Sequence, residues 1–236
     1  MKEQKLYTYT RKALEDYQMI QPGDRIAIGI SGGKDSLTLL YAMAKLMHFY
    51  PIPYELIAIT VDLGFDGFDT SELVKYSETL QVPYYVEKTQ IAQIVFDARK
   101  EPHPCSLCSR MRKGAFNEAA QKLGCNKIAY AHHKDDVLHS FLMSMLYEGR
   151  IHTFSPVTNL EKSQLTLIRP LIYAYEGEIR SFAKDHQLPV SKNPCPADGV
   201  TKRQEARELI QMLQTMVPET KERIFSAIQG SGIDGW

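Results

Sequence analysis

A six-residue run near the N-terminus has the residue types that bind phosphate groups. Gly32 and Gly33 lack side chains, so backbone N–H groups can approach an anionic ligand closely. Lys34 adds a positive charge. Asp35 stands where a Walker A loop has its metal-binding Ser or Thr, so we expect a phosphate-binding loop of another kind. A glycine-rich turn with a solvated lysine is the simpler alternative. The run reads Ser31-Gly32-Gly33-Lys34-Asp35-Ser36.

A second group of acidic and imidazole side chains occupies residues 131–136. It follows a predicted strand and opens a predicted helix, and strand ends of this kind face the ligand crevice in open α/β sheets. An acidic pair that caps a helix, beside a solvated histidine, is the alternative. Asp62 likewise follows a strand, although it could simply cap the next loop. The group reads Ala131-His132-His133-Lys134-Asp135-Asp136.

Three cysteines are spaced so that they can converge on one metal or cluster. Cys105 and Cys108 form a Cys-x-x-Cys pair, and Cys195 lies in a proline-rich segment. The spacing leaves four interpretations open: an iron-sulfur cluster, a structural zinc completed by His103, a redox dithiol, or unrelated small residues. Cys125 has no partner by spacing, and we expect it to be a buried structural residue.

The hydrophobic pattern predicts the framework that positions these residues. Short β-branched runs alternate with amphipathic segments, which is typical of a parallel, doubly wound α/β sheet. The end of the chain from residue 229 is expected to be irregular, and residues 189–199 to form a loop. The expected strands are 25–30, 56–61, 84–87, 127–131 and 165–168, and the expected helices are 4–20, 37–49, 71–80, 109–123, 135–147, 176–186 and 202–216.

The length of 236 residues favours one α/β domain with a small appendage. We expect an N-terminal helix in 1–22, an ATP-binding α/β domain in 23–190 that carries the cysteine pair, and a C-terminal loop with helices in 191–236. Basic and acidic residues balance at 28 each, so a nucleic-acid partner would need a local basic patch. No apolar run could span a bilayer, and the first ten residues lack the apolar core of a secretory signal. We therefore expect a cytoplasmic protein with no membrane partner.

Residues 31–36 resemble the SGGKDS motif of the PP-loop family at every position. Members of this family cleave ATP to AMP and pyrophosphate. The resemblance implies that Lys34 and Ser36 hold the β- and γ-phosphates of the leaving pyrophosphate, and that Asp35 positions Mg²⁺. The ATP-binding residues that it implies are Ser31, Gly32, Gly33, Lys34, Asp35, Ser36, Asp62, His133, Asp136 and Arg169.

Residues 131–136 resemble the GHHxDD segment of the tRNA-modifying branch of the family, with Ala131 in place of glycine. In that branch the segment lines the ATP site and supplies a carboxylate near the reacting groups. The resemblance carries these roles to His133, Asp135 and Asp136. Arg169, in Arg-Pro-Leu, matches a further short element and implies a guanidinium near the phosphates or the substrate.

The phosphate motif, the run Cys-Ser-Leu-Cys-Ser-Arg-Met-Arg-Lys-Gly from residue 105 and the single late cysteine together resemble the tRNA 2-thiocytidine synthetases. The resemblance spans about residues 25–207. It implies that ATP adenylates cytidine O2 in the anticodon loop and that sulfur then replaces the AMP. Cys105, Cys108 and Cys195 would hold a [4Fe-4S] cluster with one open iron, Zn²⁺ being the alternative. The implied catalytic residues are Lys34, Asp35, Asp135, Asp136 and these three cysteines.

Two local basic clusters support an RNA partner, because Lys and Arg can bind phosphates, although such clusters are commonly solvated helix faces. The expected partners are tRNA, a sulfur donor such as a cysteine desulfurase, and a second copy of the chain. Three alternatives remain open: lysidine formation, in which an amine replaces AMP, a nucleotide-binding module without catalysis, and sulfur transfer involving a small molecule. The basic residues are Arg110, Arg112, Lys113, Lys202 and Arg203.

Overall fold

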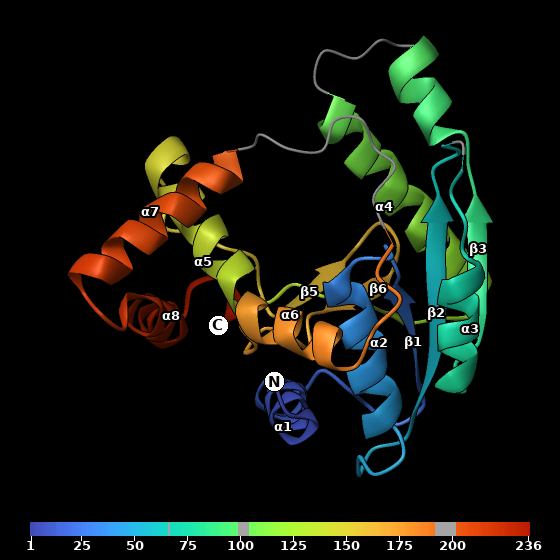
Figure 1. Ribbon diagram of the computed structural model, residues 1–236, viewed down its shortest axis with the longest axis horizontal. Helices are drawn as coiled ribbons and strands as arrows, with labels where there is room; N and C mark the ends of the chain where they lie inside the picture. Colours follow the sequence, from blue (N-terminus) through green and yellow to red (C-terminus); the bar gives the residue numbers. More distant parts are fainter. Residues whose placement is uncertain (66, 99–103, 192–201) are drawn as a thin grey trace.

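Six strands form one sheet in the part of the chain that the structure, a computed structural model, describes: residues 1–236 except 66, 99–103 and 192–201 (Figure 1). Among these strands the order is β3-β2-β1-β4-β6-β5, and only the β5–β6 pair is antiparallel. The predicted doubly wound parallel sheet is therefore confirmed. The strands are β1 (Asp24–Gly29), β2 (Tyr54–Asp62), β3 (Tyr84–Lys88), β4 (Lys127–Ala129), β5 (Val157–Leu160) and β6 (Leu165–Ile168).

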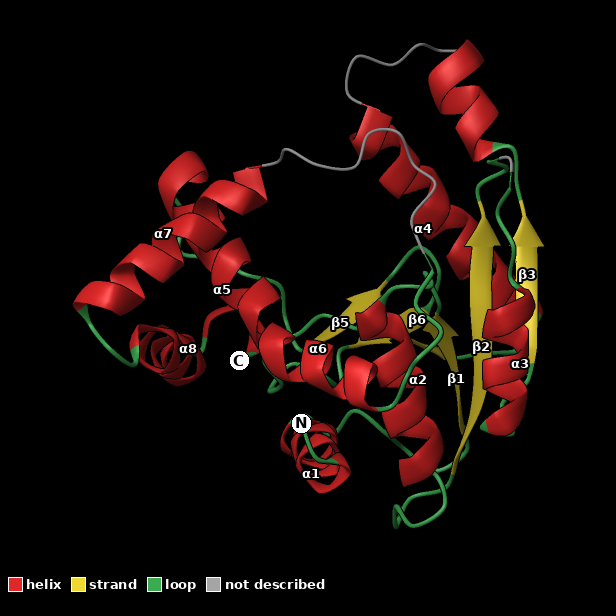
Figure 2. Cartoon of the chain, viewed as in Figure 1, coloured by secondary structure: helices red, strands yellow, loops and turns green. Residues whose placement is uncertain are grey.

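Helices cover both faces of the sheet, because the side chains of its central strand alternate between two buried layers. Ile26 and Ile28 of β1 belong to the core formed with α2 and α6, whereas Ala27 packs in the layer that contains Phe116 of α4. Figure 2 shows these helices on the two sides of the strands. The helices are α1 (Glu3–Asp16), α2 (Lys34–Leu46), α3 (Ser71–Thr79), α4 (Pro104–Lys122), α5 (Lys134–Met143), α6 (Glu176–Asp185), α7 (Lys202–Met216) and α8 (Thr220–Ser231).

The C-terminal helices extend the α5 side of the molecule. α5 packs against α7 and α8, and these two also pack against each other (Figure 1). The expectation of an irregular end from residue 229 is wrong, because α8 continues to Ser231 and Trp236 is anchored. Its indole Nε1 donates to Phe154 O at 3.2 Å, and its ring meets Phe225 edge-on.

Several other elements differ from the predicted ones at their ends or were missed. α1 stops at Asp16, short of the predicted residue 20, and Gln18 just beyond it has a left-handed φ of 46°. β5 is not among the predicted strands, since it is a four-residue strand with little apolar pattern. The π-helical turn η1 (Gln93–Ala98) and the 3₁₀ turn η3 (Ile233–Gly235) are also unpredicted. The predicted helix 135–147 is present, but its last turn is the π-helical η2 (Ser144–Glu148).

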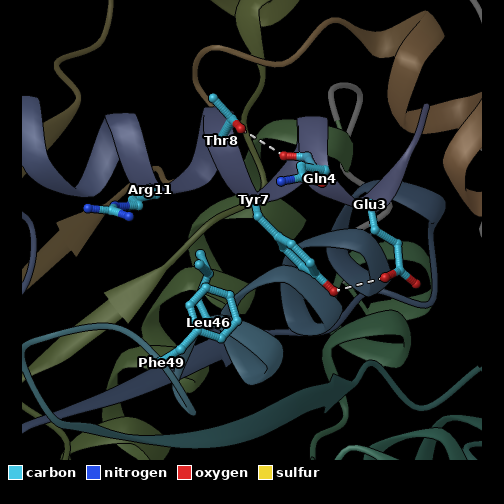
Figure 3. A pocket seen from close by; sticks show the side chains of 7 residues that line it. All are labelled: Glu3, Gln4, Tyr7, Thr8, Arg11, Leu46 and Phe49. Carbon is cyan, nitrogen blue, oxygen red and sulfur yellow. Dashed lines mark hydrogen bonds between the residues drawn. The ribbon is translucent and has the colours of Figure 1, made fainter.

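A pocket of about 480 Å³ lies between α1 and the end of α2 (Figure 3). Leu46 closes α2 twelve residues after Lys34, which is about 18 Å along a helix axis. The pocket is therefore remote from the phosphate loop, defined as residues 31–36. The pocket is lined by Glu3, Gln4, Tyr7, Thr8, Arg11, Leu46 and Phe49.

None of the described helices is both long and apolar enough to span a bilayer.

Candidate functional site

The phosphate loop connects β1 to α2 and depends on glycine at residue 32. Gly32 has φ +79°, and a Cβ at this position would lie 2.0 Å from Ser191 Oγ. The backbone of Ser191 also donates to Gly32 O at 3.0 Å. Residue 32 therefore combines a left-handed conformation with a close chain approach, and glycine satisfies both.

Serine hydroxyl groups make hydrogen bonds within the phosphate loop. Ser36 Oγ accepts from Ser31 N at 3.2 Å and donates to Gly33 O at 2.9 Å. Gly33 is the N-cap residue of α2 and provides no side-chain cap. The first N–H groups of α2 and the positive end of its dipole are thus suited to an anionic ligand.

Lys34 and Asp35 start α2 as an ion pair, with Lys34 Nζ 3.0 Å from Asp35 Oδ2. Asp35 Oδ1 is a buried atom without a hydrogen-bond partner in the described part of the chain. A buried, unpaired carboxylate oxygen is unfavourable and commonly indicates a missing ion or water. This oxygen therefore fits the expected role of Asp35 as a ligand of Mg²⁺, which prefers carboxylate oxygens.

The second motif, residues 131–136, meets the phosphate loop at His133. Its Nδ1 accepts from Asp136 N at 3.3 Å, and its backbone N–H donates to Asp136 Oδ2 at 3.1 Å, so the two residues cap α5 reciprocally. His133 Nε2 lies 3.9 Å from Asp35 Oδ1 and 3.5 Å from Asp136 Oδ2. The two motifs, about 100 residues apart in sequence, therefore form one site.

Asp135 points to a different set of partners. Its Oδ1 lies 2.6 Å from Lys221 Nζ of α8, and its Oδ2 accepts from Glu176 N at 2.7 Å. Burial alone would raise the pKa of Asp135, but the bonds from Lys221 and Glu176 outweigh it and keep the pKa below its usual range. These contacts fit a positioning role for Asp135.

Arg169 forms a buried cluster with His132, the first histidine of the second motif. His132 is not among the site residues selected from the sequence. Arg169 Nε donates to His132 Nδ1 at 3.3 Å, and the Arg169 NH1 group donates to Ser155 O and to Thr158 Oγ1. The guanidinium also covers the Phe154 ring. Burial, followed by the charge of Arg169, lowers the pKa of His132 to about 4. His132 is therefore neutral at pH 7, with its proton on Nε2.

Asp62 ends β2, where its Oδ1 accepts from Gly64 N at 2.9 Å. This contact is the loop capping that the sequence analysis gave as the alternative role of Asp62. It lies at the carboxyl ends of the strands, where the phosphate loop also leaves β1. The assignments of Asp62, Arg169 and the residues of both motifs to ATP or to catalysis remain predictions.

The cysteine pair occupies the first turn of α4. Cys105 is exposed and Cys108 is partly buried, and their spacing of three residues places them on one side of the helix. Figure 1 shows α4 beginning on the side of the sheet to which the arrowheads of β2 and β3 point. Cys125 is 7% exposed, as expected for a buried cysteine, and burial raises the pKa of its thiol.

Cys195 and His103 lie outside the described residues. The chain on either side of Cys195 contacts the site: Ser191 bonds to Gly32, and Arg203 of α7 has its NH1 group 3.8 Å from Asp136 Oδ1. Of the predicted RNA-binding residues, three on α4 are exposed, as is Arg203. The three are Arg110, Arg112 and Lys113; the side chain of Lys202 lies outside the described part.

Comparison with known proteins identifies the family. The PP-loop domain family matches residues 3–213. The tRNA-cytidine(32) 2-sulfurtransferase of Geobacter sulfurreducens is 34% identical over 220 residues, covering 92% of this chain and 86% of that protein. That of Pelobacter propionicus is 36% identical over 220 residues, covering 92% and 82%.

A solved structure extends the likeness to the whole fold. The U34-tRNA thiolase NcsA from Methanococcus maripaludis, with its [4Fe-4S] cluster, superposes with a TM-score of 0.74 at 25% identity, covering 94% of this chain and 76% of that one. The resemblance inferred from the motifs is thereby confirmed. The chain belongs to the PP-loop family and, within it, to the family of tRNA-cytidine(32) 2-sulfurtransferases.

Proposed function

We propose that this protein is an ATP-dependent tRNA sulfurtransferase that converts a cytidine to 2-thiocytidine, at position 32 as in the names of its relatives. The observation that carries the proposal is the contact between the two motifs, where His133 Nε2 lies 3.9 Å from Asp35 Oδ1. It joins a phosphate-binding loop and a carboxylate-rich helix start in one place, as adenylation requires.

ATP is the first substrate, and the loop has the groups to bind it. The N–H groups at the start of α2 would face the phosphates, and Lys34 would exchange its contact with Asp35 for one with the β- and γ-phosphates. Asp35 would hold Mg²⁺, and His133, itself beside Asp136, lies next to it. Mg²⁺ held there would neutralise charge that develops on the leaving pyrophosphate.

The reaction begins at cytidine O2, a poor leaving group on its own. O2 attacks the α-phosphorus of ATP, the α–β P–O bond breaks, and pyrophosphate leaves. Adenylation makes O2 part of AMP, so a sulfur nucleophile can form a C2–S bond while the C2–O bond breaks and AMP departs. The first step is favoured when the helix dipole and Lys34 stabilise negative charge on the leaving pyrophosphate.

Cys105, Cys108 and Cys195 fit a [4Fe-4S] cluster. Two thiols lie one turn apart on an accessible helix start, and the third is four residues from Ser191, which contacts the phosphate loop. If these three cysteines held such a cluster, it would supply iron that can bind sulfide as the sulfur nucleophile. Zn²⁺ with the same thiols is the alternative that metal analysis decides.

The tRNA itself would contact exposed basic residues. Arg110, Arg112 and Lys113 follow the cysteine pair on α4, and Arg203 begins α7 beside Asp136. Phosphate contacts from these side chains would orient the RNA without reading its sequence. A cysteine desulfurase as sulfur donor, a homodimer that enlarges the RNA surface, and a cytoplasmic location complete the proposal.

The test is an in vitro thiolation assay with protein purified without oxygen. Unmodified tRNA, Mg-ATP and sulfide should yield 2-thiocytidine and pyrophosphate, and the protein should contain iron and acid-labile sulfide in comparable amounts. Lys34→Ala should abolish both products, while Lys75→Ala, which removes an exposed lysine of α3 paired with Glu72, should leave them unchanged. Pyrophosphate release without 2-thiocytidine, or a colourless protein with one zinc, would contradict the proposal.

A further inference from the structure

Glu176, the first residue of α6, contacts three cations although no sequence motif singles it out. Its Oε1 lies 3.2 Å from Lys34 Nζ and 2.9 Å from the NH2 group of Arg180, and its Oε2 lies 3.2 Å from the NH2 group of Arg207. Its side chain is 15% exposed. Burial would raise the pKa of Glu176, but Arg180, Lys34 and Arg207 together lower it to about 2. The carboxylate is therefore ionised at any physiological pH.

We propose that Glu176 is a positioning residue that couples nucleotide binding at the phosphate loop to the docking of α7. Without nucleotide, it holds Lys34 beside the loop. When the phosphates take Lys34, the carboxylate binds Arg207 more strongly, and α7 becomes more firmly held. The proposal rests on the proposed function only in requiring that ATP binds at the phosphate loop.

Lys34 and Arg207 share the carboxylate of Glu176. Lys34 and Arg207 come from different helices and approach different oxygens of Glu176, so each reduces the attraction available to the other. A triphosphate neutralises Lys34 and draws it away from Glu176. The field of the carboxylate then acts on Arg207, in a partly buried setting where charge pairs are stronger than on the surface.

The backbone of Glu176 is held by Asp135, so the side chain of Glu176 starts from a fixed position between Lys34 and Arg207. The Glu176 N–H donates to Asp135 Oδ2 at 2.7 Å, and Asp135 is held in turn by Lys221 of α8. α7 has a second contact at the site, from Arg203 to Asp136. Because α7 directly follows the segment that contains Cys195, firmer docking of α7 connects ATP occupancy to the part of the chain that carries the third thiol.

Thermodynamic reciprocity gives the proposal a second consequence. If nucleotide strengthens the Glu176–Arg207 pair, then that pair must tighten nucleotide binding by the same factor. Arg207→Gln should therefore weaken nucleotide binding several-fold when Glu176 is present. The same change should have no effect when residue 176 is already neutral.

The experiment uses anaerobically purified full-length protein and α,β-methylene-ATP with Mg²⁺, which cannot be cleaved between the α- and β-phosphates. Amide hydrogen exchange of residues 202–216 and calorimetric affinity are measured for wild type, Glu176→Gln, Arg207→Gln and the double variant. Glu178→Gln is the matched control, since it lies in the same helical turn but pairs with Lys5. Gln has the shape of Glu, and thermal melts confirm that each variant folds.

In wild type and Glu178→Gln, the analogue should slow exchange in α7 several-fold. The analogue should bind to Glu176→Gln yet leave hydrogen exchange in α7 unchanged. It should likewise leave exchange in α7 unchanged in Arg207→Gln, which removes the other member of the pair. If the analogue protects α7 equally in wild type and Glu176→Gln, the link is wrong. The link is also wrong if Arg207→Gln changes the affinity for the analogue equally in the wild-type and Glu176→Gln backgrounds. If wild type does not bind the analogue, the proposed function fails together with the link, whereas binding without any change in α7 contradicts the link alone.

Discussion

Asp135 and Lys221 form a 2.6 Å ion pair between residues 86 positions apart in the sequence. Asp135 is 4% exposed and belongs to the second motif, whereas Lys221 belongs to α8. The pair fixes the C-terminal helices to the start of α5 and so makes them part of the framework of the site.

Removing Lys221 should therefore leave an unpaired buried carboxylate. We expect Lys221→Met to lower the free energy of unfolding by about 3 kcal/mol, as breaking a buried pair does. Urea denaturation measures the change. Adding Asp135→Asn to Lys221→Met should recover part of the loss, because the uncompensated charge is then gone. An unchanged stability in the single variant would show that the pair contributes nothing.

Gly32→Ala should disrupt the phosphate loop through both its φ of +79° and the 2.0 Å approach to Ser191 Oγ. Affinity for an ATP analogue should fall by about tenfold or more, equivalent to 1.4 kcal/mol per decade. Gly23→Ala is the control, since Gly23 has φ +83° and no atom within 4 Å of the added Cβ. Gly32→Ala combined with Ser191→Ala should recover part of the affinity. If the second change restores nothing, the clash is not the cause.

The neutral His132 predicts a specific pH dependence of stability. Its folded pKa of about 4 lies below the ordinary value of 6.5, so the unfolded chain takes up a proton first as the pH falls. Stability from this group is full above pH 6.5 and declines toward pH 4, by about 2.5 kcal/mol at pH 4.5. His132→Asn should remove this part of the decline between pH 7 and pH 4.5 in urea titrations. Parallel decline in the two proteins would contradict the assignment.

The cysteines can be separated by role. Cys105→Ala or Cys108→Ala should lower the iron and sulfide content and abolish 2-thiocytidine formation, while ATP-analogue affinity stays near that of wild type. Cys125→Ala should keep the cluster and cost about 1 kcal/mol of stability, because a small buried side chain is lost. Full iron occupancy in Cys105→Ala would rule out its role as a ligand.

Local patterns were sufficient to predict both motifs and five of the six strands of the described sheet, all except β5. The buried run of β1 and the glycines after it define a strand, a loop and a helix start within about 15 residues, and each signal is local in sequence. The same holds for the second motif, whose acidic pair lies at the start of α5, six residues after the end of β4. The rule that strand ends face the ligand crevice predicted where the second motif lies, and the structure adds that His133 Nε2 comes within 3.9 Å of Asp35 Oδ1.

Pairings between distant, individually unremarkable residues could not be predicted. Glu176 resembles any acidic residue in the first turn of a helix, and its contact with Lys34 appears only when α6 packs on α2. Nothing in the sequence around His132 indicates that Arg169 donates a hydrogen bond to it. The anchored Trp236 was missed because the glycine-rich sequence before it is typical of an irregular end.

The central claim is that this chain thiolates tRNA in the cell. The most direct measurement is mass spectrometry of tRNA nucleosides from a strain of the source organism that lacks the gene, restored with wild type, Lys34→Ala or Lys75→Ala. The account predicts that 2-thiocytidine is absent from the deletion strain, returns with wild type and Lys75→Ala, and stays absent with Lys34→Ala. An unchanged 2-thiocytidine level in the deletion strain would contradict it.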